Sequence, residues 1–140
     1  MILLDTNIIS ESMRPNPDSA VLRWLDSLVR SETWTCSIVV GELFSGVDLM
    51  PAGRKSRALR FEIERALSED FNGQVLDFDI DAARHYGAIV ANRNRIGRPI
   101  RELDAEIAAI AASHGAAVAT RNIRDFEGCG VKLINPWQKP

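Results

Sequence analysis

The first seven residues constrain the fold more than any other part of this chain. Ile2, Leu3 and Leu4 are apolar without alternation, a pattern typical of a strand covered on both faces in a parallel sheet. The run stops at Asp5, which the pattern therefore places at the carboxyl end of a strand. Open α/β sheets carry their binding crevices at that edge. We predict that the chain folds around this strand, with Asp5 either facing a crevice or capping the next helix.

Helical and strand patterns alternate along the rest of the chain. Thr6 or Asn7 is placed to cap a first short helix, and Ser37 to cap a helix that is apolar on nearly all sides and is expected to be buried. The expected strands are 2–4, 33–36, 75–78, 117–120 and 131–134; the expected helices are 8–13, 19–28, 38–47, a stretch within 51–69, 79–94 and 104–114. This order predicts an α/β fold with a mainly parallel sheet and helices on both sides.

Length and composition set outer limits. With 140 residues, 46% of them hydrophobic, the chain is expected to form a single domain spanning 1–140. Its formal charge of -2 argues against a protein that coats nucleic acid non-specifically. No apolar run approaches the roughly 20 residues that cross a membrane, and the N-terminus lacks signal-peptide features, so a cytoplasmic protein without a membrane partner is expected. Cys36 is expected to be a buried free thiol.

Four acids occupy equivalent places in this plan. Asp5 follows the first strand, Glu42 lies early in the apolar helix after the second, Asp104 opens an alanine-rich helix, and Asp125 follows the fourth strand. All four are expected at the same edge of the sheet. Glu42 would be partly desolvated there, which is costly unless a cation meets it. No Lys or Arg lies within the first three motifs to supply one.

Carboxylates that converge without histidine or cysteine indicate a hard divalent cation, Mg²⁺ or Mn²⁺ rather than zinc. Such an ion activates water and neutralises charge that develops on a phosphoryl group, so phosphodiester hydrolysis is the reaction this set suits. Structural alternatives stay open: Asp5 and Asp104 as helix caps, Glu42 bonded to backbone amides, and Asp125 paired with Arg121 or Arg124.

An arginine-rich segment precedes the alanine-rich helix. Residues 93–101 read as a turn-rich surface loop without an acid. Its guanidinium groups could bind phosphates or simply keep the loop soluble. The residues concerned are Arg93, Arg95, Arg98 and Arg101.

Four ordered motifs carry a family resemblance across essentially the whole chain. They are Leu4-Asp5-Thr6-Asn7, Ser37-x-x-x-Gly41-Glu42-Leu43, Asp104-Ala105-x-Ile107-Ala108-Ala109 and Thr120-Arg121-Asn122-x-x-Asp125-Phe126, closed by Ile134-Asn135-Pro136-Trp137. Together they resemble the PIN-domain nucleases, and more closely the VapC-type toxins of bacterial toxin–antitoxin pairs, including the FitB-like branch. The resemblance implies a PIN-like three-layer sandwich around a mainly parallel sheet.

The resemblance also implies roles. Asp5, Glu42 and Asp104 correspond to the family's metal-binding acids, and Asp125 ranks above Asn122 as the fourth acidic group. Asn7 and Thr120 match positions that support the acids or orient water. The implied activity is an Mg²⁺- or Mn²⁺-dependent endoribonuclease acting on RNA, often tRNA or rRNA, with the arginines of the 93–101 loop as possible contacts to RNA phosphates.

The implied partners are a second copy of the chain and a small antitoxin whose C-terminal segment lies across the active-site groove, the complex assembling on operator DNA. Two other functions fit the same residues: a metal-dependent nuclease acting on DNA or small phosphate esters, and a non-catalytic module that binds RNA or protein. The sequence does not identify the RNA target or the cleavage site.

Overall fold

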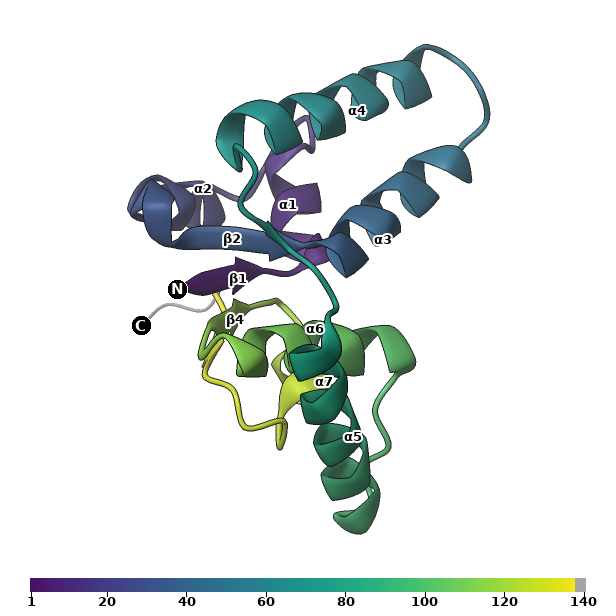
Figure 1. The fold of residues 1–140 in the computed structure, drawn as a ribbon. Coiled ribbons are helices and arrows are strands. Elements are labelled where there is room, and N and C mark those ends of the chain that lie inside the picture. The colour runs from purple at the N-terminus through teal and green to yellow at the C-terminus, as the bar shows by residue number, and fades with distance from the viewer. Residues whose placement is uncertain (138–140) are drawn as a thin grey trace.

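A five-stranded, all-parallel sheet forms the centre of the protein in a computed structural model that describes residues 1–137 (Figure 1). The strand order is β3-β2-β1-β4-β5. The strands are β1 (Ile2–Leu4), β2 (Thr33–Cys36), β3 (Val75–Leu76), β4 (Ala117–Ala119) and β5 (Leu133–Ile134). The predicted strands and their parallel arrangement are confirmed, although β3 and β5 are shorter than expected.

Two groups of helices sandwich the sheet. One group is α1 (Thr6–Ser12), α2 (Ser19–Asp26), α3 (Ser37–Asp48) and α4 (Arg54–Arg65); the other is α5 (Ile80–Arg95), α6 (Glu102–Ser113) and α7 (Ile123–Phe126). Figure 1 shows the first group on one side of the strands and the second on the other. Right-handed crossovers require this, because the chain moves outward from β1 to β3 and then returns past β1 to reach β4. The three-layer prediction is confirmed.

From β1 the chain adds strands toward one edge of the sheet, and from β4 it adds them toward the other edge. The carboxyl ends of these two neighbouring parallel strands therefore form the switch point of the sheet. Leu4 pairs with Ala119 in the parallel register, and the backbone N–H of Asp5 donates to the carbonyl of Ala119 at 3.0 Å. Asp5 is therefore anchored at the position where open α/β sheets form binding crevices.

The core lies on both faces of the central strands, and α6 contributes much of it on one face. Leu3 on β1, Val118 on β4, and Ile107 and Ile110 on α6 are fully buried. The alanines of α6 are buried as well, which allows this helix to approach the sheet closely. Cys36 and Cys129 are buried free cysteines, as predicted for Cys36, and burial raises the pKa of Cys36 to about 12.

Three local expectations were wrong. Helix α1 begins at Thr6 with Asp5 as its N-cap, rather than with Thr6 or Asn7, and α3 begins at Ser37 itself. Helix α3 is also not buried all round: Val39, Leu43 and Val47 face the core, whereas Gly41, Ser45 and Gly46 are exposed. A helix whose residues are apolar on every side can still leave one face exposed, because the sequence does not show how much of its surface other elements of the domain bury.

The helices η1 (Arg30–Glu32) and η2 (Ala66–Asp70) complete the secondary structure of the described residues. None of the helices described is both long enough and apolar enough to cross a membrane.

Candidate active site

Asp5 follows β1 at its carboxyl end and is held by groups from two segments, the start of α1 and the residue after β4. Its Oδ1 accepts the backbone N–H of Thr6 at 2.8 Å, and its Oδ2 accepts the hydroxyl of Thr120 at 2.8 Å. The Asn7 amide lies 3.5 Å from the same Oδ2. Only 6% of Asp5 is exposed, and this burial raises the pKa of its carboxyl, an effect that the two short hydrogen bonds partly offset. The N-cap and crevice interpretations of Asp5 therefore both hold.

Glu42 approaches Asp5 from the second turn of α3. Its Oε1 accepts the hydroxyl of Thr6 at 3.0 Å, a contact that sequence reasoning missed. The side chain is 25% exposed, in line with the partial desolvation that was predicted. Its negative charge contributes to the raised pKa of Asp5, which places the two carboxylates close enough to repel each other.

Asp104 brings the four acids together. It lies in the first turn of α6, and only 8% of the residue is exposed. Its pKa is raised from 3.8 to about 6, first by burial and then by the charges of Asp5, Asp125 and Glu42, while Arg101 lowers it. The charges of Asp5 after β1, Glu42 on α3 and Asp125 on α7 therefore all reach the carboxyl of Asp104 on α6.

Asp125 is the most accessible of the four. It lies on α7 at the surface, and no ion pair joins it to Arg121 or Arg124 among the described residues. The backbone N–H of Asn122 donates to the hydroxyl of Thr120 at 3.1 Å, while its side chain is exposed. The ranking of Asp125 above Asn122 as an acidic group stays a prediction.

The raised pKa of Asp104 makes stability depend on pH. Between about pH 4 and 6 the folded protein holds a proton that the unfolded chain has released, so the free energy of unfolding falls as pH rises through this window. In EDTA, we expect Asp104→Asn to be more stable than the wild type at pH 7 but not at pH 4. Urea unfolding at the two pH values measures this, and equal differences at both would contradict it.

Thr120 links the acids to the segment after β4. It is fully buried, and its hydroxyl donates to Asp5 while accepting the Asn7 amide at 3.3 Å and the Asn122 N–H. A hydroxyl has one donor and two acceptor sites, so all three are used. The carbonyl oxygen of the Asn7 side chain accepts the backbone N–H of Arg121 at 3.1 Å. Asn7 and Thr120 thus lie where a supporting role requires them.

Thr120→Val is expected to destabilise the protein by about 1–3 kcal/mol, because the buried carboxylate of Asp5 loses a hydrogen bond without compensation. Asp5 loses one of the two bonds that hold its pKa down, so that pKa rises further. Urea unfolding gives the first effect, and Thr120→Ser, which keeps the hydroxyl, serves as the control. A valine variant as stable as the serine variant would show that the hydroxyl bonds are not needed.

Arg101, which lies just before the motif that starts at Asp104, supplies a cation that the first three motifs themselves lack. Its Nε lies 3.4 Å from Oδ2 of Asp104, and its Nη2 lies 3.8 Å from Oε2 of Glu42. The sequence signal was present, since Arg101 stands three residues before Asp104 at the start of a helix. Within residues 1–137, no three acidic, His or Cys side chains are gathered closely enough to form a ready-made metal site.

The other arginines of the 93–101 segment divide into two kinds. The expectation of a surface loop is wrong for Arg93, which lies in the last turn of α5 and is only 4% exposed. Its guanidinium donates to the carbonyls of Arg98, Asp125 and Glu127 at 2.6, 2.8 and 3.0 Å, so it is not available to a phosphate. Arg98 bonds Glu127 and the carbonyl of Arg124, each at 2.9 Å. Arg95 is exposed, as expected.

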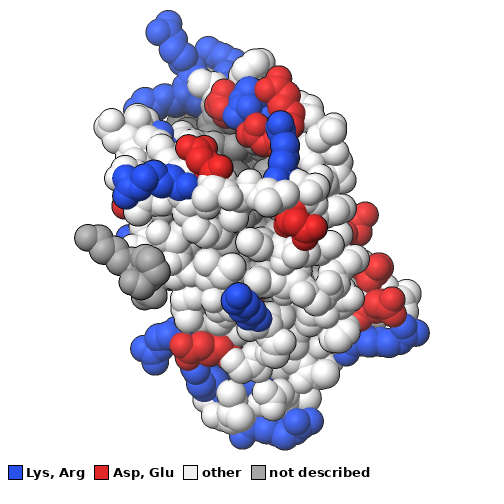
Figure 2. Space-filling view, turned by 90° about the vertical axis from the view of Figure 1, so that its left-hand side faces the viewer, with Lys and Arg blue, Asp and Glu red and all other residues white. Residues whose placement is uncertain are grey.

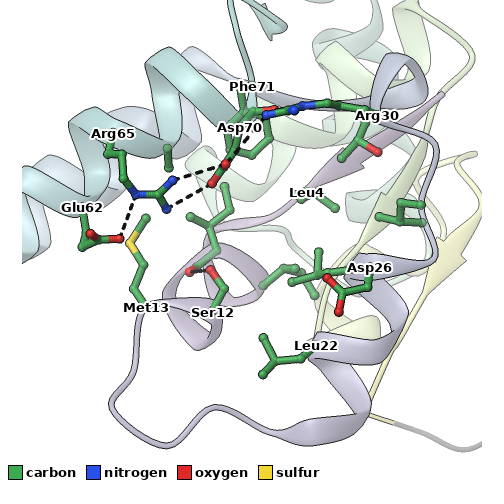
Figure 3. Close-up of a pocket in the computed structure, with 16 residues that line it drawn as sticks. Leu4, Ser12, Met13, Leu22, Asp26, Arg30, Glu62, Arg65, Asp70 and Phe71 are labelled. Atoms are coloured by element: carbon green, nitrogen blue, oxygen red, sulfur yellow. Dashed lines mark hydrogen bonds and ion pairs between the residues drawn. The ribbon is translucent and has the colours of Figure 1, made fainter.

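A separate groove of about 580 Å³ lies between α1, α2 and the α4–η2 segment. Figure 2, which looks at the side carrying the N-terminus, shows a hollow among acidic and basic side chains. Apolar and charged side chains line the groove together, and among them Arg65 bonds Glu62 and Asp70, each at 3.2 Å (Figure 3). The apolar lining includes Leu4, Ile8, Ile9, Leu22, Leu25 and Phe71.

Comparisons with known proteins agree with this geometry. The family model for the PIN domain matches residues 2–128. The chain is 41% identical over 138 residues to "VapC ribonuclease Y4jK" of Sinorhizobium fredii, with 99% of each chain covered. It is 40% identical over 137 residues to "Toxin FitB" of Neisseria gonorrhoeae, covering 98% of this chain and 99% of FitB.

A solved structure described as FitAB bound to an IR36 DNA fragment superposes with a TM-score of 0.93 at 38% identity, covering 100% of this chain and 98% of the other. The predicted resemblance to VapC-type and FitB-like PIN proteins is confirmed.

Proposed function

This chain belongs to the PIN-domain family, and from that membership and its acidic site we propose that it is a metal-dependent endoribonuclease, the toxin of a toxin–antitoxin pair. One observation carries the proposal. The negative charges of Asp5, Glu42 and Asp125 all help to raise the pKa of the buried Asp104 carboxyl near the switch point of the sheet. Acids that repel one another in a buried position are costly unless a cation relieves them.

The donor set fits a hard divalent ion. It consists of carboxylate oxygens alone, and Mg²⁺ commonly keeps several waters while using one or two protein carboxylates. A preassembled group of three is therefore not required. Asp5, Glu42 and Asp104 would hold the ion, with Asp125 at the exposed side. When bound, such an ion lowers the pKa of a coordinated water and neutralises charge on a phosphate.

The protein's own residues supply the positioning. Thr120, Thr6 and Asn7 fix Asp5 and Glu42 through hydrogen bonds, so these carboxylates need not reorganise when RNA arrives. Asp125 is exposed and can meet substrate or solvent. Of the arginines in the 93–101 segment, Arg95 and Arg101 are exposed, and we propose these two as the contacts to RNA phosphates.

The partner we propose is a small antitoxin, supported by the relative solved as a FitAB complex on DNA. The groove beside α1 and α2 suits an amphipathic helix, because apolar side chains and charged groups of both signs line it. Leu4 in its lining precedes Asp5 in the sequence, but the four acids are not among the side chains that line the groove.

We propose a homodimer as well, since the outer face of the apolar helix α3 is only partly covered within one chain. The formal charge of -2 fits a toxin that leaves DNA contact to its antitoxin.

The experiment is cleavage of defined RNAs by the purified protein, with Mn²⁺, with Mg²⁺ and with EDTA, in parallel with Asp5→Asn. Metal-dependent cuts that disappear in the variant support the proposal. RNA binding without cuts would favour the non-catalytic module, and cuts in matched single-stranded DNA but not RNA would favour a DNA nuclease. Addition of the cognate antitoxin should suppress the cuts.

A further inference from the structure

The guanidinium of Arg101 lies among the acids that the proposed function assigns to a metal ion. It contacts Asp104 at 3.4 Å and Glu42 at 3.8 Å, and it lowers the pKa of Asp5 as well. Arg101 holds the N-cap position of α6, yet its side chain makes no capping bond. Within residues 1–137, it is the cation that forms ion pairs with Glu42 and Asp104.

Asp104 depends on this arginine more than the other acids do. Asp5 accepts hydrogen bonds from Thr6 and Thr120, and Glu42 accepts one from Thr6. Among the described residues, the carboxylate of Asp104 has no hydrogen bond, and Arg101 is the cation that contacts it. The side chain of Asp104 is only 11% exposed, and a single cation compensates its charge. We therefore expect Asp104 to be the carboxylate that an incoming cation binds first.

The arginine is held loosely. Its two contacts are longer than the roughly 2.7–2.9 Å of tight charge-assisted hydrogen bonds. Its side chain is 68% exposed, so solvent screens the attraction and leaves the guanidinium room to turn outward. A compact divalent ion carries twice the charge and can approach the carboxylate oxygens more closely.

We propose that Arg101 is an internal counter-ion that partly offsets the charges of Glu42 and Asp104 in the metal-free protein and is displaced when a divalent cation binds. This inference rests on the proposed function, because it takes the acids to be the metal site. Between catalytic cycles the guanidinium partly offsets the negative charges of Glu42 and Asp104. Because it competes with the divalent cation for these carboxylates, it also weakens the affinity of the site for that cation.

The test is titration of Mn²⁺ into the purified protein by calorimetry, without RNA. Arg101→Gln should bind Mn²⁺ about fivefold more tightly than the wild type, the size expected when two partly exposed ion pairs no longer compete. Arg95→Gln is the matched control, since it removes the same charge from an exposed arginine without an ion pair among the described residues. Its affinity should stay within about twofold of the wild type.

Thermal unfolding supplies a readout that does not involve metal affinity. In EDTA, Arg101→Gln should unfold at a lower temperature than Arg95→Gln, because Asp104 loses its counter-ion. With saturating Mn²⁺ the two variants should unfold at similar temperatures.

An Arg101→Gln variant that binds Mn²⁺ no more tightly than the wild type would overturn the inference. An equal gain in Arg95→Gln would overturn it too, because net charge would then explain the effect. The proposed function fails separately, when the wild type neither binds Mn²⁺ nor cleaves RNA in its presence.

Discussion

Asp104→Asn is expected to reduce RNA cleavage by at least about a hundredfold, since even groups that only orient metal ligands cost ten- to a hundredfold when they are removed. The charges of the other three acids all raise the pKa of this buried carboxyl. Asparagine keeps the shape of the side chain and removes its charge. The variant should fold normally, because loss of a repelled buried charge does not destabilise the protein at pH 7. Single-turnover cleavage of one defined RNA in Mn²⁺ measures the effect.

Glu102→Gln is the matched control for that experiment. Glu102 lies on the same helix, in the same first turn, and is exposed, so its replacement should leave the cleavage rate within about twofold of the wild type. Cleavage by Asp104→Asn at more than a tenth of the wild-type rate would remove Asp104 from the proposed metal site.

Arg93→Met is expected to cost about 3 kcal/mol of the free energy of unfolding, the largest stability effect we predict. Its guanidinium is buried and donates to three carbonyl groups, two of them on the segment that carries Asp125. Methionine fills part of the space but leaves those carbonyls without their donor. Urea denaturation measures the loss.

The exposed Arg95 provides the comparison, since Arg95→Met removes the same side chain type two residues further along α5. Its cost should remain below about 0.5 kcal/mol. A loss of less than 1 kcal/mol in Arg93→Met would mean that solvent or other side chains satisfy the carbonyl groups. Cleavage activity should fall with Arg93→Met as well, because α7 loses its tie to α5.

The sequence was informative wherever a local pattern determines the environment. An unbroken apolar run before Asp5 requires burial on both faces, and parallel strands bring their carboxyl ends to one edge. From these two facts the common location of Asp5, Glu42, Asp104 and Asp125 could be predicted before any coordinates. Their assignment to a family came from the motifs around them.

Contacts between distant segments were not accessible in this way. Arg93 bonds carbonyls 32 and 34 residues further along the chain, and nothing in an arginine-rich segment distinguishes such a residue from a solvated one. Arg101 reaches Glu42 across the sheet edge for the same reason. The half-exposed face of α3 was missed because periodicity reports apolar character, not the surface that covers it.

The central place of β1 determines when during synthesis the protein can become active. Asp5 emerges from the ribosome first, but its position depends on pairing with β4, some 112 residues later, and on the hydroxyl of Thr120. Asp104 and Asp125 also belong to the last third of the chain. On the proposed function, a partly translated chain therefore holds an incomplete set of acids and would not yet cut RNA while it is being made.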